Sequence, residues 1–284
     1  MLRLNYFGQT CSQIEYPDDH GSMLRILMDY RNNLLSGVSV PFLSSVRPSA
    51  GYVFNYLTLQ NTYLAIERFR TPTGYSEQIQ YNATGMQVTN TSTIPCVTAL
   101  NAFPGNGQPA ILKNYQYSPT FNFTGFFSGK NQIDKNQDNL YLVIGNYNYS
   151  STERIVENGH IISSTERTFN RFHLLINEEK TEGGKRLTRN FTYNEMAGVN
   201  YYQQPENLQL LASLVTVYTD LSSGAMRQEL ETYQTDRWGN TLMTLHADGK
   251  RAFRILCHVK QTTASSPDLV ARQNKWLTVT MSNS

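Results

Sequence analysis

The sequence "SSTERIVENGHIISSTER" occupies residues 150–167 and carries the word Ser-Ser-Thr-Glu-Arg on both sides of Asn158-Gly159. Asn-Gly between β-favouring residues favours a two-residue type I′ turn, because both central residues of that turn need positive φ. With this turn, Glu157 faces His160 and Ile155 faces Ile162. The stretch therefore predicts a β-hairpin centred on Asn158-Gly159.

Neither face of this predicted hairpin is a continuous apolar stripe. An ordinary antiparallel sheet alternates apolar and polar residues, because one of its faces covers a core. Here both faces mix charged, hydroxyl and aliphatic side chains. One face carries Glu153, Ile155, Glu157, His160 and Ile162, and the other carries Thr152, Arg154, Val156, Ile161 and Thr165. We therefore expect water on both sides of the hairpin.

The composition of the whole chain agrees with an extended β structure. Hydrophobic residues make up 39% and charged residues 16% of the 284 residues. Both values lie below the usual globular mix of about 45–50% apolar and about 25% charged residues. Eighteen Tyr and thirteen Phe, against two Trp, favour strands. The composition predicts an all-β fold with a modest core.

Several classes of function are disfavoured by charge, cysteine spacing and hydropathy. A formal net charge of +2 gives no concentrated basic footprint for nucleic acid. Cys11, Cys96 and Cys257 stand far apart without a Cys-x-x-Cys spacing, so neither a disulfide framework nor a zinc site is indicated. No apolar run is long enough to span a membrane, and the N-terminal residues do not resemble a signal peptide.

Turn signals rich in Gly, Asn and Pro recur roughly every ten to fifteen residues, with short β-favouring runs between them. This spacing predicts a series of antiparallel hairpins. The run 23–35 resembles a helix, but Asn32-Asn33 interrupts it and favours strands, whereas 206–218 fits either a helix or a strand. The turn signals lie at 19–21, 32–33, 72–74, 82–85, 104–107, 158–159, 183–184, 222–224, 238–240 and 248–249.

A weak internal repeat links "YNATGM" (81–86) with "TDRWGN" (235–240). In each copy an Asn or Asp can accept backbone hydrogen bonds across a turn, and a Gly three residues later can take positive φ. In the second copy another Asp-Gly turn follows ten residues after Gly239. The repeat-motif residues are Tyr81, Asn82 and Gly85 in the first copy, and Asp236, Gly239, Asn240, Asp248 and Gly249 in the second.

The stretch "TYQTDRWGNTLMTLHADGK" (232–250) resembles the RHS/YD repeat, whose signature is Tyr-Asp-x-x-Gly-Asn followed by a strand and a second Asp-Gly turn. Thr235 stands where the repeat has Tyr. The segments 104–118, 138–154 and 168–179 are similar, in the same order, to the region that precedes the repeats in bacterial RHS proteins and in the C component of insecticidal toxin complexes.

This resemblance implies that residues 1–260 form an antiparallel β-hairpin ribbon, part of a hollow shell that encloses or chaperones a toxic C-terminal cargo. The partners it implies are other RHS-shell or toxin-complex polypeptides and the cargo itself. Residues 261–284 form an atypical C-terminal tail, and neither a second run of repeats nor an Asp-Pro-x-Gly cleavage region occurs. The chain is therefore interpreted as a truncated shell segment, either secreted with a toxin system or cytoplasmic.

No motif predicts catalysis. The five His residues show no His-Glu-x-x-His spacing, and neither a Gly-x-Ser-x-Gly elbow nor a Gly-rich phosphate loop is present. We expect a non-enzymatic protein without a cofactor or a metal.

A second hypothesis is a carbohydrate- or cell-surface-binding β protein. Exposed Tyr beside Asn and Gln suits stacking on sugars, and four Tyr residues are candidates for such a platform: Tyr115, Tyr117, Tyr147 and Tyr149. The same rings can instead form cross-strand ladders that hold the sheet together.

Overall fold

The computed structural model describes residues 2–17, 19–39, 51–89, 91–118, 123–125, 145–236, 238–257 and 275–281, and only the backbone of residues 254–257 and 275–281. The chain divides into two compact units. Unit 1 comprises residues 1–116 and 152–163, and unit 2 comprises residues 117–151 and 164–284.

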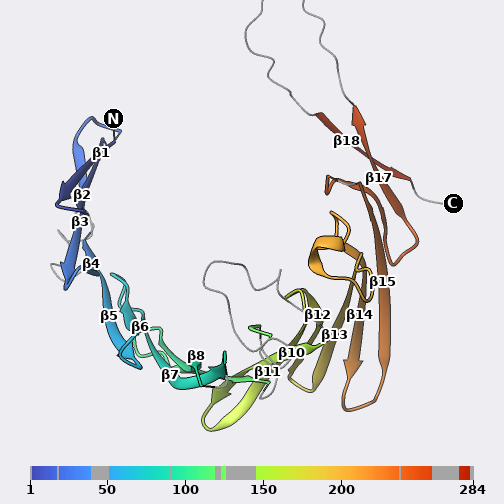
Figure 1. The fold of residues 1–284 in the computed structure, drawn as a ribbon, viewed down its shortest axis with the longest axis horizontal. Coiled ribbons are helices and arrows are strands. Elements are labelled where there is room, and N and C mark those ends of the chain that lie inside the picture. The colour runs from blue at the N-terminus through green and yellow to red at the C-terminus, as the bar shows by residue number, and fades with distance from the viewer. Residues whose placement is uncertain are drawn as a thin grey trace, which may run out of the picture. The chain divides into compact units, whose positions relative to one another are not determined.

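Unit 1 is built from strands that each pair in antiparallel fashion with the next strand along the chain (Figure 1). The strands are β1 (Arg3–Phe7), β2 (Thr10–Pro17), β3 (Met23–Arg31), β4 (Leu34–Ser39), β5 (Gly51–Leu59), β6 (Tyr63–Arg70), β7 (Ser76–Gln87), β8 (Thr93–Phe103) and β9 (Ile111–Tyr117).

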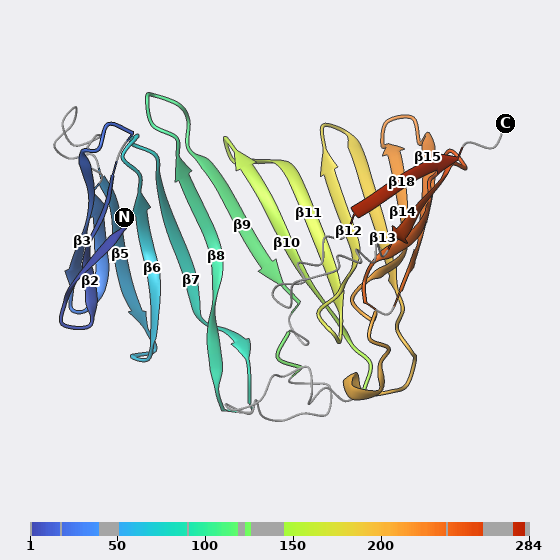
Figure 2. The ribbon, with the colours of Figure 1, turned by 90° about the horizontal axis from the view of Figure 1, so that it is seen from above.

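Unit 2 follows the same rule, and Figure 2 shows β12 to β15 side by side. A short 3₁₀ helix, η2 (Tyr201–Gln203), stands between β13 and β14. β10 and β11, which form the hairpin of residues 150–167, have residues in both units. The strands are β10 (Asn148–Glu157), β11 (His160–Asn170), β12 (Leu175–Glu182), β13 (Lys185–Tyr193), β14 (Leu211–Asp220), β15 (Met226–Thr235), β16 (Thr241–Leu245), β17 (Arg251–Cys257) and β18 (Lys275–Met281).

The expected all-β, antiparallel fold is confirmed, and within the described ranges no α-helix occurs. Correspondingly, no described helix offers the length and apolarity needed to cross a bilayer. The run 23–35 is the β3–β4 hairpin, and 206–218 runs into β14. The tail of residues 261–284 lies largely outside the described residues, but its segment β18 pairs with β17.

The turns that join neighbouring strands follow the chemistry of their residues. Asn158 and Gly159 have φ of +50° and +80°, and Asn32 and Asn33 have φ of +50° and +63°. Two successive positive φ values are those of a type I′ turn, whose twist matches that of the flanking strands. The Asn-Gly prediction is therefore confirmed, and Arg31 pairs with Leu34 across the Asn-Asn turn.

The core is small, as the composition predicted. A sheet in which every strand pairs only with its chain neighbours offers few positions enclosed on all sides. At the tip of the β10–β11 hairpin, the adjacent residues Ile161 and Ile162 are 59% and 46% exposed, so both faces of this tip meet solvent. The buried apolar residues among those described are Cys96, Ala99, Ala102, Tyr147, Phe172 and Leu208.

Candidate functional site

The second copy of the repeat motif forms a closed turn between β15 and β16. The Asp236 carboxylate accepts hydrogen bonds from the backbone N–H groups of Trp238 (2.9 Å) and Asn240 (2.8 Å) and from the Asn240 side chain (2.8 Å). Gly239 has φ of +87°, and its N–H donates to the carbonyl of Asp236 at 3.1 Å. These donors hold the pKa of Asp236 below its usual value. The roles predicted for Asp236 and Gly239 are confirmed.

The Asp248-Gly249 turn between β16 and β17 has the same backbone pattern. The N–H of His246 donates to the carbonyl of Lys250 at 2.8 Å, and the N–H of Gly249, with φ of +80°, donates back to the carbonyl of His246 at 2.9 Å. The Asp248 carboxylate accepts from the N–H of Lys250 at 3.0 Å. Two turns of one type thus follow each other in the region that resembles the RHS/YD repeat.

A third turn of this type, at residues 170–174, was missed in the sequence. Asn170 accepts from the N–H groups of Phe172 and Leu174 through its side-chain oxygen, both at 3.0 Å. The position of positive φ is held by His173, with φ of +62°, where the other two turns have Gly. The Asn three residues before His173 was a usable signal, but the segment has no Gly and was not among the predicted turns.

The first copy of the motif lies inside strand β7, which corrects the prediction for Gly85, whereas the Asn82 side chain does accept a backbone hydrogen bond, from the N–H of Thr84 at 3.0 Å. Strand β7 continues through residues 76–87, and the register with β8 slips between Asn82 and Met86. Gly85 does not have positive φ; instead, a Cβ on it would lie 2.1 Å from Sγ of Cys96. Gly85 is therefore a close-approach residue at an irregularity inside a strand. Tyr81 donates its hydroxyl to the carbonyl of Ile66 at 2.7 Å and stays in the ladder.

One face of unit 1 is largely apolar across nine strands, interrupted by Glu77 opposite Phe69 and by Lys113 opposite Leu100. The register places aromatic and aliphatic residues opposite one another, as in the pairs Met28–Val38 and Phe54–Phe69, whose two rings lie 5.2 Å apart. We call this the apolar face of unit 1; its members are Leu4, Ile14, Tyr16, Leu24, Ile26, Met28, Val38, Tyr52, Phe54, Phe69, Ile79, Leu100, Ala102 and Ile111. Most members are half-buried by their neighbours, and Leu4 and Tyr52 are 48% and 37% exposed.

The opposite face of unit 1 is polar. Rows of paired residues such as Arg3–Glu15–Arg25 and Asn55–Arg68–Gln78 cross its strands. The mixture of polar and apolar residues on both faces, predicted for the hairpin of residues 150–167, therefore does not extend to strands β1 to β9. These strands alternate in the ordinary way, because aromatic and β-branched residues recur at every second position.

Two of the four Tyr residues proposed to bind sugars lie in one aromatic cluster of unit 2. The rings of Tyr147 and Tyr149 are 6.4 Å apart, and Tyr149 stacks on Phe169 at 5.2 Å. The Tyr149 hydroxyl lies 2.9 Å from Nδ1 of His173. Tyr147 is only 6% exposed, and burial raises its pKa to about 12. The cluster supports the ladder interpretation of these rings.

Tyr115 and Tyr117 lie on β9, and both are half-buried. Glycan stacking on the four Tyr residues stays a prediction.

A buried Arg holds the loop after β13 to the 170–174 turn. The Arg171 side chain is 5% exposed, and its Nη2 donates to the carbonyl of Val199 at 2.8 Å and lies 3.4 Å from Oε1 of Glu195. Its Nη1 donates to the carbonyl of Gly145 at 3.2 Å, and its guanidinium lies 4.3 Å from the centre of the Phe172 ring. The Arg171 side chain thus joins three segments of unit 2: the 170–174 turn, the segment at Gly145 and the loop after β13.

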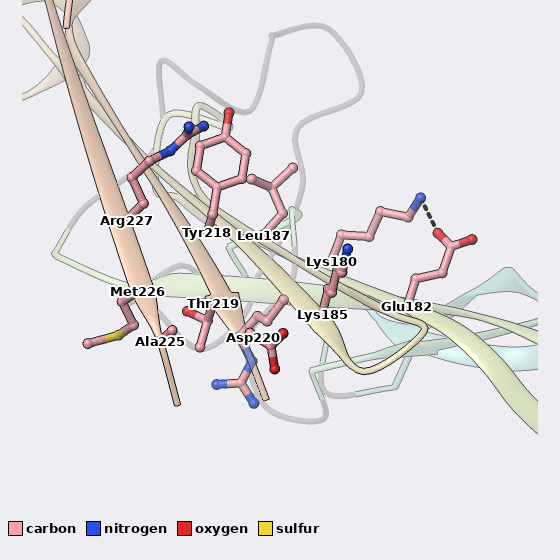
Figure 3. A pocket seen from close by; sticks show the side chains of 11 residues that line it. Lys180, Glu182, Lys185, Leu187, Tyr218, Thr219, Asp220, Ala225, Met226 and Arg227 are labelled. Atoms are coloured by element: carbon pink, nitrogen blue, oxygen red, sulfur yellow. Dashed lines mark ion pairs between the residues drawn. The ribbon is translucent and has the colours of Figure 1, made fainter. Parts of the chain in front are cut away.

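A groove crosses β12, β13, β14 and β15 near the ends of the two hairpins. The register aligns one residue from each strand in a row, with Lys180 opposite Leu187, Leu187 opposite Tyr218, and Tyr218 opposite Arg227. Figure 3 shows Arg227, Tyr218 and Leu187 in succession, with Lys180 farther along. The groove has a volume of about 640 Å³. We call it the cationic groove; its lining residues are Lys180, Glu182, Lys185, Arg186, Leu187, Tyr218, Thr219, Asp220, Ala225, Met226 and Arg227.

The charged residues of the cationic groove have different interaction partners. Lys180 pairs with Glu182 at 2.5 Å, and Arg227 lies over the Tyr218 ring at 4.6 Å from its centre. The Asp220 carboxylate accepts from the Ser222 hydroxyl and from the N–H groups of residues 222 and 223, which closes the β14–β15 turn and lowers the pKa of Asp220 to about 2.

No cluster of three or more His, Cys, Asp or Glu side chains that could hold a metal occurs in the part of the chain that the structure describes.

Comparisons with known proteins give structural neighbours only. No family model matches the chain, and no curated protein matches its sequence. Among solved structures, it is similar to chains of TcdB2-TccC3-TEV (9% identity, TM-score 0.19), of the Photorhabdus luminescens Tc holotoxin pore (9% identity, TM-score 0.18), and of TcdB2-TccC3 without its hypervariable C-terminal region (9% identity, TM-score 0.19). The matches cover 94–95% of this chain and 18% of each of those chains. TM-scores this low do not establish a common fold.

Proposed function

We propose that this chain is a non-enzymatic wall segment of an RHS-type toxin shell, and that the apolar face of unit 1 contacts a non-native polypeptide cargo. The observation that carries the proposal is this face itself. It extends over nine strands, and no second layer covers it among the described residues. A large exposed apolar surface marks a site of protein contact in a soluble protein.

The chemistry of the two faces supports a wall rather than a sandwich. A sandwich buries the apolar faces of two sheets against each other, about 10 Å apart. In the described part of unit 1, all strand pairs follow chain order, and only small residues such as Ala99 and Ala102 are fully buried. An unfolded client supplies the apolar side chains that the missing second layer would otherwise supply.

We further propose that this chain binds other shell or toxin-complex polypeptides. Edge strand β1 pairs only with β2 among the described strands, so its outer edge is available for another β-strand. The turns Asp236–Asn240 and His246–Lys250 support the RHS assignment, because each closes at the Gly that the repeat signature places there.

The test is suppression of aggregation of a thermally unfolding client such as citrate synthase, followed by light scattering. The variant Leu4→Asn/Tyr52→Asn should suppress aggregation less than the natural chain, because it places amides on the apolar face. Leu27→Asn is the matched control, since Leu27 is 43% exposed and lies on the polar face. Equal suppression by all three proteins, each with an unchanged circular dichroism spectrum, contradicts the cargo contact.

Carbohydrate binding is not part of this proposal. Stacking of a sugar requires an exposed ring face, and the ring of Tyr147 is enclosed. Saturable glycan binding that is lost in Tyr147→Ala and Tyr149→Ala would favour that hypothesis instead.

A further inference from the structure

We propose that the cationic groove of unit 2 binds an extended acidic peptide in which two acidic residues flank an apolar residue, in the order acidic-x-apolar-x-acidic. The site lies in the other unit from the apolar face of unit 1. It differs from that face in chemistry, and the proposal does not depend on the shell function.

The first argument is the order of side chains along the groove. The row Lys180–Leu187–Tyr218–Arg227 places a cation at each end and two apolar side chains between them. These four residues lie on one face, because each is directly opposite the next in an antiparallel register. A ligand that matches the row has a negative charge at each end and an apolar centre.

The second argument is spacing. Neighbouring strands lie about 4.8 Å apart, so the four strands place the two cations about 14 Å apart at their backbones. In an extended peptide, residues i and i+4 are about 13.6 Å apart and point to the same side as residue i+2. An extended peptide that crosses the strands therefore presents both acidic residues to the cations and the central residue to Leu187 and Tyr218.

The third argument is the charge that remains available. Lys180 and Arg227 are paired only with exposed carboxylates, Glu182 and Glu229, whose side chains are 57% and 37% exposed. Such surface ion pairs are weak and exchange readily for a ligand carboxylate. Lys185 lies in the adjacent row and, among the described residues, has no carboxylate at ion-pair distance.

Of the two carboxylates that line the groove, Glu182 is solvent-exposed beside Lys180, and Asp220 is already engaged by its own turn. Asp220 lies opposite Lys185, and its oxygens face the donors of its own turn, including the Ser222 hydroxyl at 2.5 Å. The lining therefore presents more available positive than negative charge. This bias favours an acidic peptide over a neutral peptide of the same shape.

The experiment is fluorescence anisotropy of the full chain with a labelled peptide that contains Asp-Ser-Leu-Ser-Glu. The neutral peptide Asn-Ser-Leu-Ser-Gln and a peptide with the two acidic residues adjacent are the ligand controls. We expect saturable binding of the first peptide that weakens with salt, and at least tenfold weaker binding of both controls.

The protein variants place the binding in the groove. Lys180→Gln/Arg227→Gln should weaken binding at least tenfold, and Tyr218→Ser should weaken it severalfold. Arg25→Gln is the control, because Arg25 is an arginine of unit 1 whose side chain is 62% exposed and pairs with Glu15, and it does not line the groove. It should leave the affinity unchanged.

Three outcomes would overturn the proposal: no saturable binding at low salt, equal affinity for the acidic and neutral peptides, or equal losses in Arg25→Gln and in the double variant. A fourth is tighter binding of an oligogalacturonate than of the peptide. That result would assign the groove to acidic carbohydrate, because uronates present carboxylates along a chain of rings that can stack on Tyr218.

Discussion

Replacement of Arg171 by Met tests whether one buried cation holds unit 2 together. Met keeps much of the apolar volume beside Phe172 but removes the guanidinium. Without the guanidinium, the carbonyl of Val199 loses a donor at 2.8 Å and the carbonyl of Gly145 loses a donor at 3.2 Å. Glu195 loses the cation with which it pairs.

The expected cost follows from these contacts. A hydrogen bond from a charged donor contributes about 1.5–3 kcal/mol, and the removal of one partner of a buried ion pair costs about 3–5 kcal/mol. Glu195 is 29% exposed and can regain water, and the bond from Arg171 to Gly145 is long. Both facts reduce the cost, so we expect Arg171→Met to lower the free energy of unfolding by about 2–4 kcal/mol.

Urea unfolding followed by circular dichroism measures this difference, and hydrogen exchange locates it. Backbone amides of residues 194–210 should exchange faster in Arg171→Met, because the loop loses its bond through Val199. The control is Arg227→Met, whose guanidinium is 69% exposed and pairs with Glu229 at the surface, so its effect should stay below about 1 kcal/mol. If the two variants lose the same stability, or if the loop exchanges as before, Arg171 is not an anchor.

Three further predictions follow from single sites. Gly85→Ala should destabilise the chain by about 1–3 kcal/mol in urea unfolding, because the new methyl group overlaps Sγ of Cys96, and a smaller loss in the background Cys96→Ala would confirm that cause. Asp236→Ala should speed hydrogen exchange at the amide of Trp238, whereas unchanged exchange would show that the carboxylate does not hold the turn. The pKa of Tyr147 is about 12 in the folded chain and about 10 in the unfolded chain, so the folded state keeps its proton longer. The contribution of Tyr147 to stability should therefore be constant below pH 10 and fall by about 1.4 kcal/mol per pH unit between pH 10 and pH 12, and Tyr147→Phe should remove this part of the pH dependence.

Local chemistry made the strands and most turns predictable from the residues. Asn158-Gly159 and Asp236 to Asn240 are determined by which side chains tolerate positive φ and which can accept backbone hydrogen bonds, and both depend on only a few neighbouring residues. The all-β class follows equally from aromatic-rich runs between turn residues.

The sequence predictions failed where a contact between residues far apart in the sequence outweighed the local turn signal. "YNATGM" has the letters of a turn, but pairing with β8 keeps it in a strand, and Cys96 explains the need for Gly85. His173 takes a Gly-like conformation inside a cluster that includes Tyr149, which lies 24 residues away. A single sequence does not disclose such partners, because their separation along the chain is unrelated to their distance in space.

Register decided the surfaces on which function depends. The residues of the apolar face of unit 1 and of the cationic groove are all visible in the sequence, but each surface exists only because specific residues of successive strands stand opposite one another. A shift of one residue in any pairing would move that strand's side chains to the other face. The alternation of residues sets which side chains share a side of one strand, and only the hydrogen-bonded ladder between strands assembles those sides into a surface that can bind a partner.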